Sequence, residues 1–222
     1  MPERTAVILV SGAGGGVSGP GGIYPSLATK LATLFHIPVL RLDYRKPARN
    51  AYCVPDIHAG MDFLRSTYRV SKFVLIGWSF GGAPVFTVGS GGRKGQIAGV
   101  ATVASQTAET SGIRTLAPIP VLLMHGTGDR SLSYRCSTDL FTGYGTHPEG
   151  NRELKLFDGD DHGLTKNSEE VEQLLLQFAV RCCDVALKEG GERDMKENLI
   201  GDEGEEILTM QEGHDLDNGE HL

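Results

Sequence analysis

Short apolar runs alternate with longer amphipathic stretches along residues 1–187 of the chain. Six of these runs are mostly rich in Val, Leu and Ile, and we interpret them as strands: 6–10, 38–44, 72–78, 97–104, 120–126 and 152–158. Most of them lack strict alternation of apolar and polar residues, which is typical of parallel strands covered on both faces. The pattern therefore predicts a buried, mostly parallel sheet.

The intervals between the runs have the lengths and patterns of crossover helices. We expect helices over 24–35, 55–68, 80–88 and 132–141, whereas 106–117 is a weaker candidate. The last helix, ending near Val185, is the clearest, because its apolar residues keep to one stripe and its polar residues to the opposite side. Asn167 and Glu170 are spaced as a capping pair at its start. Alternating strands and helices predict a doubly wound α/β domain with helices on both faces of the sheet.

Charge divides the chain into two parts. The 222 residues carry a net charge of −7 and 40% hydrophobic residues, enough for one sizeable core. Residues 188–222 hold twelve acidic and three basic residues, whereas 1–187 hold sixteen and eighteen. We therefore expect an α/β domain over 1–187 and an acidic, disordered tail over 188–222. The nearly neutral domain gives no electrostatic reason to expect nucleic acid or an anionic membrane as a partner.

Targeting and metal-binding signals are weak. The apolar run near the amino terminus is too short for a signal peptide, and no stretch approaches the roughly 20 apolar residues of a membrane span. The four cysteines have neither CxxC nor His-paired zinc spacing, so we expect reduced thiols and no metal. These features favour a cytoplasmic protein. The oligomeric state cannot be predicted from the sequence.

One short motif carries candidate chemistry. Residues 77–81, Gly-Trp-Ser-Phe-Gly, match G-x-S-x-G between a predicted strand and a predicted helix. At such a junction a tight, strained turn exposes the hydroxyl of Ser79 above the edge of the sheet. A serine hydroxyl is a poor nucleophile at neutral pH, so a base and a group that orients the base are needed as well.

Two later loops supply candidates for those partners. Asp129 lies just beyond the fifth predicted strand and His162 follows the sixth, so both should lie at the same rim as Ser79. Asp160 and Asp161 are alternative acids, although an acid next to the histidine in sequence rarely reaches its far nitrogen. His125 lies at the end of an apolar strand, where a packed or hydrogen-bonded core histidine is expected.

With "GWSFGG", "HGTGD" and "DDHG" in this order, the chain resembles the α/β-hydrolase superfamily over nearly all of 1–187. It is similar to the small, cap-free branch that includes dienelactone hydrolases and compact carboxylesterases. The resemblance implies a serine hydrolase without a cofactor, with Ser79 as nucleophile, Asp129 as acid and His162 as base. It would cleave a small ester, thioester or lactone through an acyl-enzyme on Ser79, with a small acyl compound as its partner.

Acyl transfer also needs two backbone N–H groups to hold the developing oxyanion. Phe80, directly after the nucleophile, supplies one by position. We expect the second in the loop after the first strand, from Ala13 or, failing that, from Gly12. The superfamily commonly has His-Gly where this chain has Ser11 and Gly12, so the anchoring of this loop is open.

The same glycine loop supports a rival interpretation. Gly14, Gly16 and Gly19 satisfy G-x-G-x-x-G and Asp43 closes the second predicted strand, as in NAD(P)-binding short-chain dehydrogenases. Against this, the sequence "PGG" at 20–22 delays the next helix, and a Tyr68-x-x-x-Lys72 pair comes too early for the catalytic pair of that family. A third possibility is an α/β-hydrolase scaffold that only binds partners, because fold alone does not establish chemistry.

Overall fold

The computed structural model describes residues 4–145 and 151–185. The predicted acidic tail at 188–222 lies outside the described residues. Six strands form a single sheet: β1 (Thr5–Val10), β2 (Val39–Leu42), β3 (Lys72–Trp78), β4 (Ile97–Val103), β5 (Val121–Gly126) and β6 (Arg152–Phe157). Every neighbouring pair is parallel, in the order β2-β1-β3-β4-β5-β6. This confirms the predicted parallel sheet.

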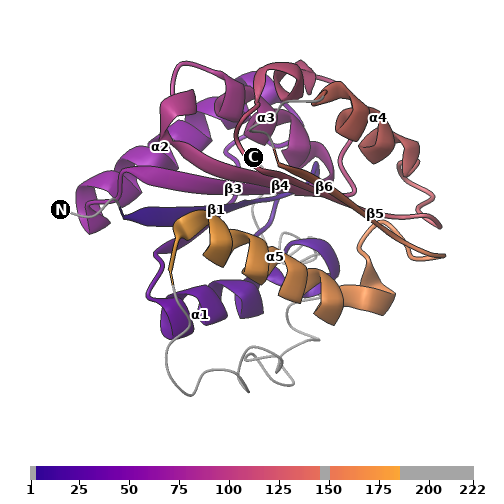
Figure 1. Cartoon of the computed structure of the whole chain (residues 1–222), viewed down its shortest axis with the longest axis horizontal. Helices are drawn as coiled ribbons and strands as arrows, with labels where there is room; N and C mark the ends of the chain where they lie inside the picture. Colours follow the sequence, from indigo (N-terminus) through magenta and orange to yellow (C-terminus); the bar gives the residue numbers. More distant parts are fainter. Residues whose placement is uncertain (1–3, 146–150, 186–222) are drawn as a thin grey trace, which may run out of the picture.

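In the described part of the chain, five α-helices cover the two faces of the sheet: α1 (Tyr24–Phe35), α2 (Asn50–Tyr68), α3 (Gly82–Ser90), α4 (Arg135–Gly143) and α5 (Ser168–Cys183). Figure 1 shows α1 and α5 together on one face and α2, α3 and α4 on the other. Within the described residues, no helix is both long and apolar enough to cross a membrane. The arrangement confirms the doubly wound α/β fold expected from the sequence.

The strand order reverses direction between β1 and β3. The chain passes from β1 outward to β2, then crosses back over β1 and continues through β3 toward β6. The loops that follow β1 and β3 therefore leave the sheet in adjacent positions, with Val10 in register with Gly77. In open α/β sheets this point, outside the carboxyl ends of the strands, is where ligands bind.

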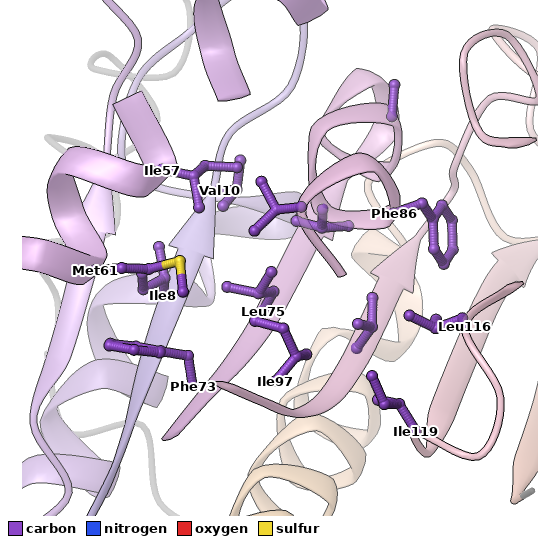
Figure 2. Close-up of a cluster of buried hydrophobic side chains, with 14 of the residues drawn as sticks. Ile8, Val10, Ile57, Met61, Phe73, Leu75, Phe86, Ile97, Leu116 and Ile119 are labelled. Atoms are coloured by element: carbon purple, nitrogen blue, oxygen red, sulfur yellow. The ribbon is translucent and has the colours of Figure 1, made fainter. Parts of the chain in front are cut away.

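Alternate side chains of the strands fill two separate cores. In β1, for example, Ile8 and Val10 pack toward α2 and α3, whereas Val7 and Leu9 pack toward α1 and α5. Figure 2 shows part of the first core, where Ile57 and Met61 of α2 lie against the sheet. Because both faces are buried, each central strand has to be apolar along its whole length, which explains the near-continuous runs.

Helix boundaries depart from the predicted ones at four places. α4 spans Arg135–Gly143 rather than 132–141. α2 begins at Asn50 rather than at Pro55, which lies inside it. The segment after β3 first forms a short 3-10 helix, η2 (Ser79–Gly81), before α3 begins at Gly82. The weak candidate at 106–117 forms only a 3-10 helix, η4 (Ser111–Thr115). The predicted start of α2 at Pro55 was wrong. A proline in the early part of a helix removes one backbone hydrogen bond, and α2 tolerates this loss.

A buried ion pair joins the two helices on one face. The Lys30 ammonium of α1 lies 2.9 Å from Glu172 Oε2 of α5, and the two side chains are 1% and 6% exposed. Glu172 Oε1 has no hydrogen-bond partner within the described part of the chain. Removing one member of such a pair leaves the other charge buried without compensation, whereas replacing both with apolar groups does not.

We therefore predict that Lys30→Met alone lowers the free energy of unfolding by about 3–5 kcal/mol. The double variant Lys30→Met, Glu172→Leu should recover most of that loss, because no charge stays buried. Guanidinium unfolding curves measure both. The matched control is Arg181→Met, which breaks the exposed Arg181–Glu153 pair and should cost less than about 1 kcal/mol. Equal losses in the single and double variants would contradict the prediction.

Candidate active site

Ser79 lies at a sharp turn between β3 and α3, at the carboxyl edge of the sheet. Its φ of 54° is in the left-handed region, which a residue with a side chain seldom adopts outside turns. Trp78, directly before it, still has extended backbone. The chain therefore reverses within one residue, and this turn carries the serine hydroxyl on its outer side, as the G-x-S-x-G pattern predicts.

The glycines around Ser79 allow this turn to form, because they have no β-carbon. A β-carbon at Gly77 would lie 2.5 Å from the Gly81 carbonyl oxygen, and one at Gly81 would lie 2.7 Å from the Ser11 carbonyl oxygen. A β-carbon at Gly82 would overlap the Ser105 hydroxyl. Larger residues at these positions would push the turn away from the ends of β1 and β4. The glycines of the motif thus have a packing reason, independent of any chemistry.

The structure brings together the three side chains singled out from the sequence. His162 Nε2 lies 2.9 Å from Ser79 Oγ, and His162 Nδ1 lies 2.6 Å from Asp129 Oδ2. Because Nδ1 faces a carboxylate, it carries the ring proton of the neutral imidazole, and Nε2 is left to accept a hydrogen bond from the serine. Ser79, Asp129 and His162, which are far apart along the chain, therefore form one hydrogen-bonded row.

The Asp129 side chain is fully buried and accepts several hydrogen bonds. Its Oδ1 accepts the backbone N–H groups of Ser131 and Leu132 at 2.7 and 2.9 Å. Its Oδ2 accepts His162 Nδ1–H and, at 3.0 Å, Nε2 of a second histidine, His125. Burial acts to raise the pKa of Asp129, but the hydrogen bonds from His162, Leu132 and Ser131 outweigh it and hold the pKa below its usual value.

The loop that carries His162 is organised by its two neighbouring aspartates. Asp160 is fully buried and accepts the backbone N–H groups of Asp161, Lys166 and Asn167. Asp161 accepts those of two later residues of the same loop. Neither carboxylate contacts the His162 ring in the described structure. The alternative acids considered above therefore hold the loop rather than the imidazole.

The predicted capping pair at the start of α5 is wrong. Asn167 is the residue before the helix, but its side chain makes no cap hydrogen bond. Its amide Nδ2 instead donates to Asp160 Oδ2 at 2.7 Å. Donation of Nδ2 to this buried carboxylate, a strong acceptor, fixes the orientation of the amide, and Asn167 joins the His162 loop to α5.

Trp78 connects two parts of the site, a role that the sequence left undecided. Its indole Nε1–H donates to the His162 carbonyl oxygen at 3.2 Å, and its ring lies 5.8 Å from the imidazole. The other side of the indole faces the glycine loop, since a β-carbon at Gly12 would lie 3.3 Å from it. By contrast, Phe80 is buried in the core edge-on to Tyr44.

The glycine loop after β1 is tied to β2 by Asp43. Asp43 Oδ1 accepts the N–H of Gly16 at 2.9 Å and that of Tyr44 at 2.7 Å. Gly15 has a φ of 79°, and a β-carbon there would lie 2.9 Å from the same oxygen. In the dehydrogenase interpretation this carboxylate would bind a ribose. Here it is hydrogen-bonded to the loop itself.

Of the two loop residues expected to donate to the oxyanion, Gly12 lies beside Ser79. A β-carbon at Gly12 would lie 3.6 Å from Ser79 Cβ, and Gly12 is buried, whereas Ala13 is exposed. The Phe80 N–H lies in the first turn after the nucleophile, where helical N–H groups have no partner within the helix. The assignment of Phe80 with Ala13 or Gly12 as oxyanion donors stays a prediction.

Other features of the dehydrogenase interpretation lie away from the site. Tyr68 ends α2 and Lys72 begins β3, so both lie at the amino edge of the sheet, opposite Ser79. Within residues 4–145 and 151–185, no three His, Cys, Asp or Glu side chains are grouped as metal ligands.

Solved structures resemble the whole described domain. Est1E from Butyrivibrio proteoclasticus has a TM-score of 0.67 at 17% identity, covering 82% of this chain and 89% of that chain. The esterase domain of a Rhodothermus marinus protein has a TM-score of 0.61 at 21% identity, covering 80% and 87%. An α/β serine hydrolase homologue from Coxiella burnetii has 0.61 at 18%, covering 78% and 84%. No protein-family profile and no curated protein matches the sequence.

These neighbours show that the chain has the α/β-hydrolase fold, as the order of its motifs predicts. The resemblance stated from "GWSFGG", "HGTGD" and "DDHG" is confirmed at the level of the superfamily fold. At these identities the comparison concerns the fold, so any chemistry has to be argued from the residues of the site.

The lowered pKa of Asp129 predicts a pH-dependent contribution to stability. A carboxylate whose pKa is depressed on folding stabilises the folded state above the unfolded value of about 3.9. That contribution is lost as the pH falls through the lowered pKa. We therefore expect Asp129→Asn to unfold at lower guanidinium concentration than wild type at pH 7.

The difference between Asp129→Asn and wild type should narrow steadily below about pH 4, as the wild-type carboxylate becomes protonated. Asp139→Asn, in an exposed residue of α4, is the matched control and should change stability by less than about 0.5 kcal/mol. A stability difference for Asp129→Asn that stays constant down to pH 2 would contradict the assignment.

Proposed function

We propose that the protein is a serine hydrolase that cleaves a small ester, thioester or lactone through an acyl-enzyme on Ser79. The observation that carries this proposal is the continuous hydrogen-bonded row from Ser79 Oγ through His162 to the buried Asp129 carboxylate. Each contact has the length that proton transfer from a serine to a base requires. The fold of the esterase neighbours is in accord with it.

In the proposed first step, Ser79 Oγ attacks the substrate carbonyl while His162 Nε2 takes the hydroxyl proton. The negative charge that develops on the carbonyl oxygen is held by the N–H of Phe80 and by an N–H of the glycine loop, from Gly12 or Ala13. Asp129 keeps the imidazole in the required tautomer and stabilises the imidazolium. His162 then gives the proton to the leaving alcohol, thiol or, in a lactone, ring oxygen.

In the second step, His162 removes a proton from a water molecule, which attacks the acyl-enzyme carbonyl. The tetrahedral intermediate collapses, Ser79 takes the proton back from His162, and the free acid leaves. The side chain of His162 is 22% exposed whereas that of Asp129 is fully buried. Water and substrate can therefore reach the base, while the carboxylate that orients it is shielded.

An accessible site supports the choice of small substrates. The connection between β4 and β5 contains only η4 as a helical element, too little for a lid domain over Ser79. A lidless site does not enclose a long acyl chain, so short or exposed acyl groups fit best. The class of ester, thioester or lactone is set by the chemistry of an acyl-enzyme rather than by any contact with substrate.

The two other functions have weaker support. A dehydrogenase would need Asp43 free for a ribose, but its Oδ1 is taken up by Gly16 and Tyr44. A scaffold that only binds partners has no use for a strained serine hydrogen-bonded to a histidine and a buried acid.

We predict that a fluorophosphonate probe labels the wild-type protein on one peptide, the one that contains Ser79, and that p-nitrophenyl acetate is hydrolysed with a burst. Ser79→Ala should abolish labelling, and His162→Ala should reduce the rate by about a thousandfold or more. Ser90→Ala, in α3, is the control and should label normally. Labelling that persists in Ser79→Ala would refute the proposal, as would an unlabelled, folded wild type.

Asp43 provides a second test, because it ties down the loop expected to hold the oxyanion. Asp43→Ala frees Gly16 and should lower kcat about tenfold, less than the hundredfold to thousandfold for a lost oxyanion donor. Asp43→Asn keeps an oxygen acceptor and should stay closer to wild type. Asp62→Ala, in α2, is the control; it breaks a surface ion pair with Arg93. Unchanged kcat in Asp43→Ala would show that the loop needs no such anchor.

A further inference from the structure

A second histidine lies behind the acid of the site. His125 is the penultimate residue of β5, four residues before Asp129, and is completely buried. Its Nε2 lies 3.0 Å from Asp129 Oδ2 and 3.1 Å from the Leu132 carbonyl oxygen. Its Nδ1 lies 2.8 Å from Ser137 Oγ of α4. The mechanism proposed above gives this histidine no role, although it contacts the same carboxylate oxygen as His162.

The surroundings of His125 determine which ring nitrogen carries the proton. Nε2 faces two acceptors, the Asp129 carboxylate and the Leu132 carbonyl, so it must be the donor. Nδ1 then accepts a hydrogen bond from the Ser137 hydroxyl. Burial lowers the pKa of His125, more strongly than the contacts with Leu132 and Asp129 raise it, which favours the neutral ring.

We propose that His125 is a positioning residue for the catalytic base, acting through Asp129. This inference rests on the proposed function of Ser79 and His162. The Nε2–H of His125 holds Oδ2 in line with His162 Nδ1 and takes up part of the negative charge of the carboxylate. Ser137 fixes the tautomer that makes this possible, by occupying the other ring nitrogen.

Two consequences follow from this arrangement. With one donor fewer, the Asp129 carboxylate is less firmly oriented, so the row from Asp129 to Ser79 is productive less often and kcat falls. A carboxylate that shares less of its charge also attracts the imidazolium form of His162 more strongly. Loss of His125 should therefore shift the acid limb of the pH–rate profile to higher pH.

Few other titratable groups surround His125. Among the described residues that interact with it or with its acid, Asp129 lies in the loop after β5, His162 in the loop after β6, and Cys136 in α4. Burial raises the pKa of the Cys136 thiol, which favours its neutral form. A shift of the acid limb is then attributed to the two histidines and the aspartate.

The test is the second-order rate constant for fluorophosphonate labelling of Ser79 in the full chain, measured from pH 5 to pH 9 with the thermal unfolding midpoint. We expect His125→Phe to label about tenfold to hundredfold more slowly, with the acid limb moved to higher pH. His125→Gln keeps an N–H donor toward Asp129 and should recover most of the rate. The labelling rate of Ser137→Ala should lie between those of His125→Phe and His125→Gln, and its acid limb should also move to higher pH.

His58→Phe, in a half-buried histidine of α2, is the matched control and should leave rate and pH profile unchanged. The inference is overturned if folded His125→Phe labels at the wild-type rate with an unmoved acid limb, or if His125→Gln loses as much as His125→Phe. If His125→Phe does not fold, His125→Gln and Ser137→Ala decide, and a wild-type profile in Ser137→Ala overturns it.

The outcome also separates this inference from the proposed function. A folded wild type that is not labelled refutes the hydrolase, and with it the positioning role. A wild type that is labelled at Ser79, together with unaffected His125 and Ser137 variants, refutes only the role of His125. A purely structural histidine would lower the unfolding midpoint without moving the acid limb.

Discussion

A buried negative charge on Asp129 is the constraint around which the carboxyl edge of the sheet is built. A carboxylate removed from water must be compensated by hydrogen bonds, and Asp129 receives four N–H donors from three places. Two come from the turn after it, one from the end of β5 and one from the His162 loop. Satisfying this one charge therefore fixes the turn, the second histidine and the candidate base relative to one another.

Backbone strain collects at the same edge. Eight non-glycine residues of the described chain have a positive φ. Three of them, His36, Arg69 and Asp184, directly follow helices, where a left-handed residue is common. The other five lie in loops that follow strands: Ala48, Ser79, Ala104, Glu109 and Leu164. Each costs of order 1–3 kcal/mol, which the regular packing of the two cores has to offset.

The division between strained edge and regular body explains which features the sequence predicted. The strands and the parallel order followed from apolar runs, because a doubly covered sheet permits little else. Ser79, Asp129 and His162 could be placed at one rim because carboxyl ends of parallel strands share an edge. For Ser79 the glycines on either side gave a further reason, which the close approach of Gly81 to the end of β1 bears out.

The features that the sequence did not predict are hydrogen bonds between side chains and groups that are distant along the chain. Asn167 has the spacing of a capping residue, yet its amide bonds to the buried Asp160, a partner that no local pattern identifies. Asp43 has the position of a ribose-binding acid, yet it accepts the N–H of Gly16. His125 was expected in the core, but its contact with Asp129 requires the turn at 126–129 to fold back on the strand end. Such pairings are set by tertiary structure rather than by sequence neighbours.

The combination of strain and buried charge argues for chemistry rather than for a binding scaffold. Local rules are broken mainly where function requires it, and here a positive φ, a buried acid and two histidines meet within one hydrogen-bonded group. A glycine at 79 would remove the strain at that position, and a structure without the buried carboxylate would need none of the four N–H donors that compensate it. The chain instead has a serine at a position with left-handed backbone and places a base 2.9 Å from its hydroxyl. A strained serine joined through a histidine to a buried acid in one hydrogen-bonded row is consistent with the proposed role of Ser79 as an activated nucleophile.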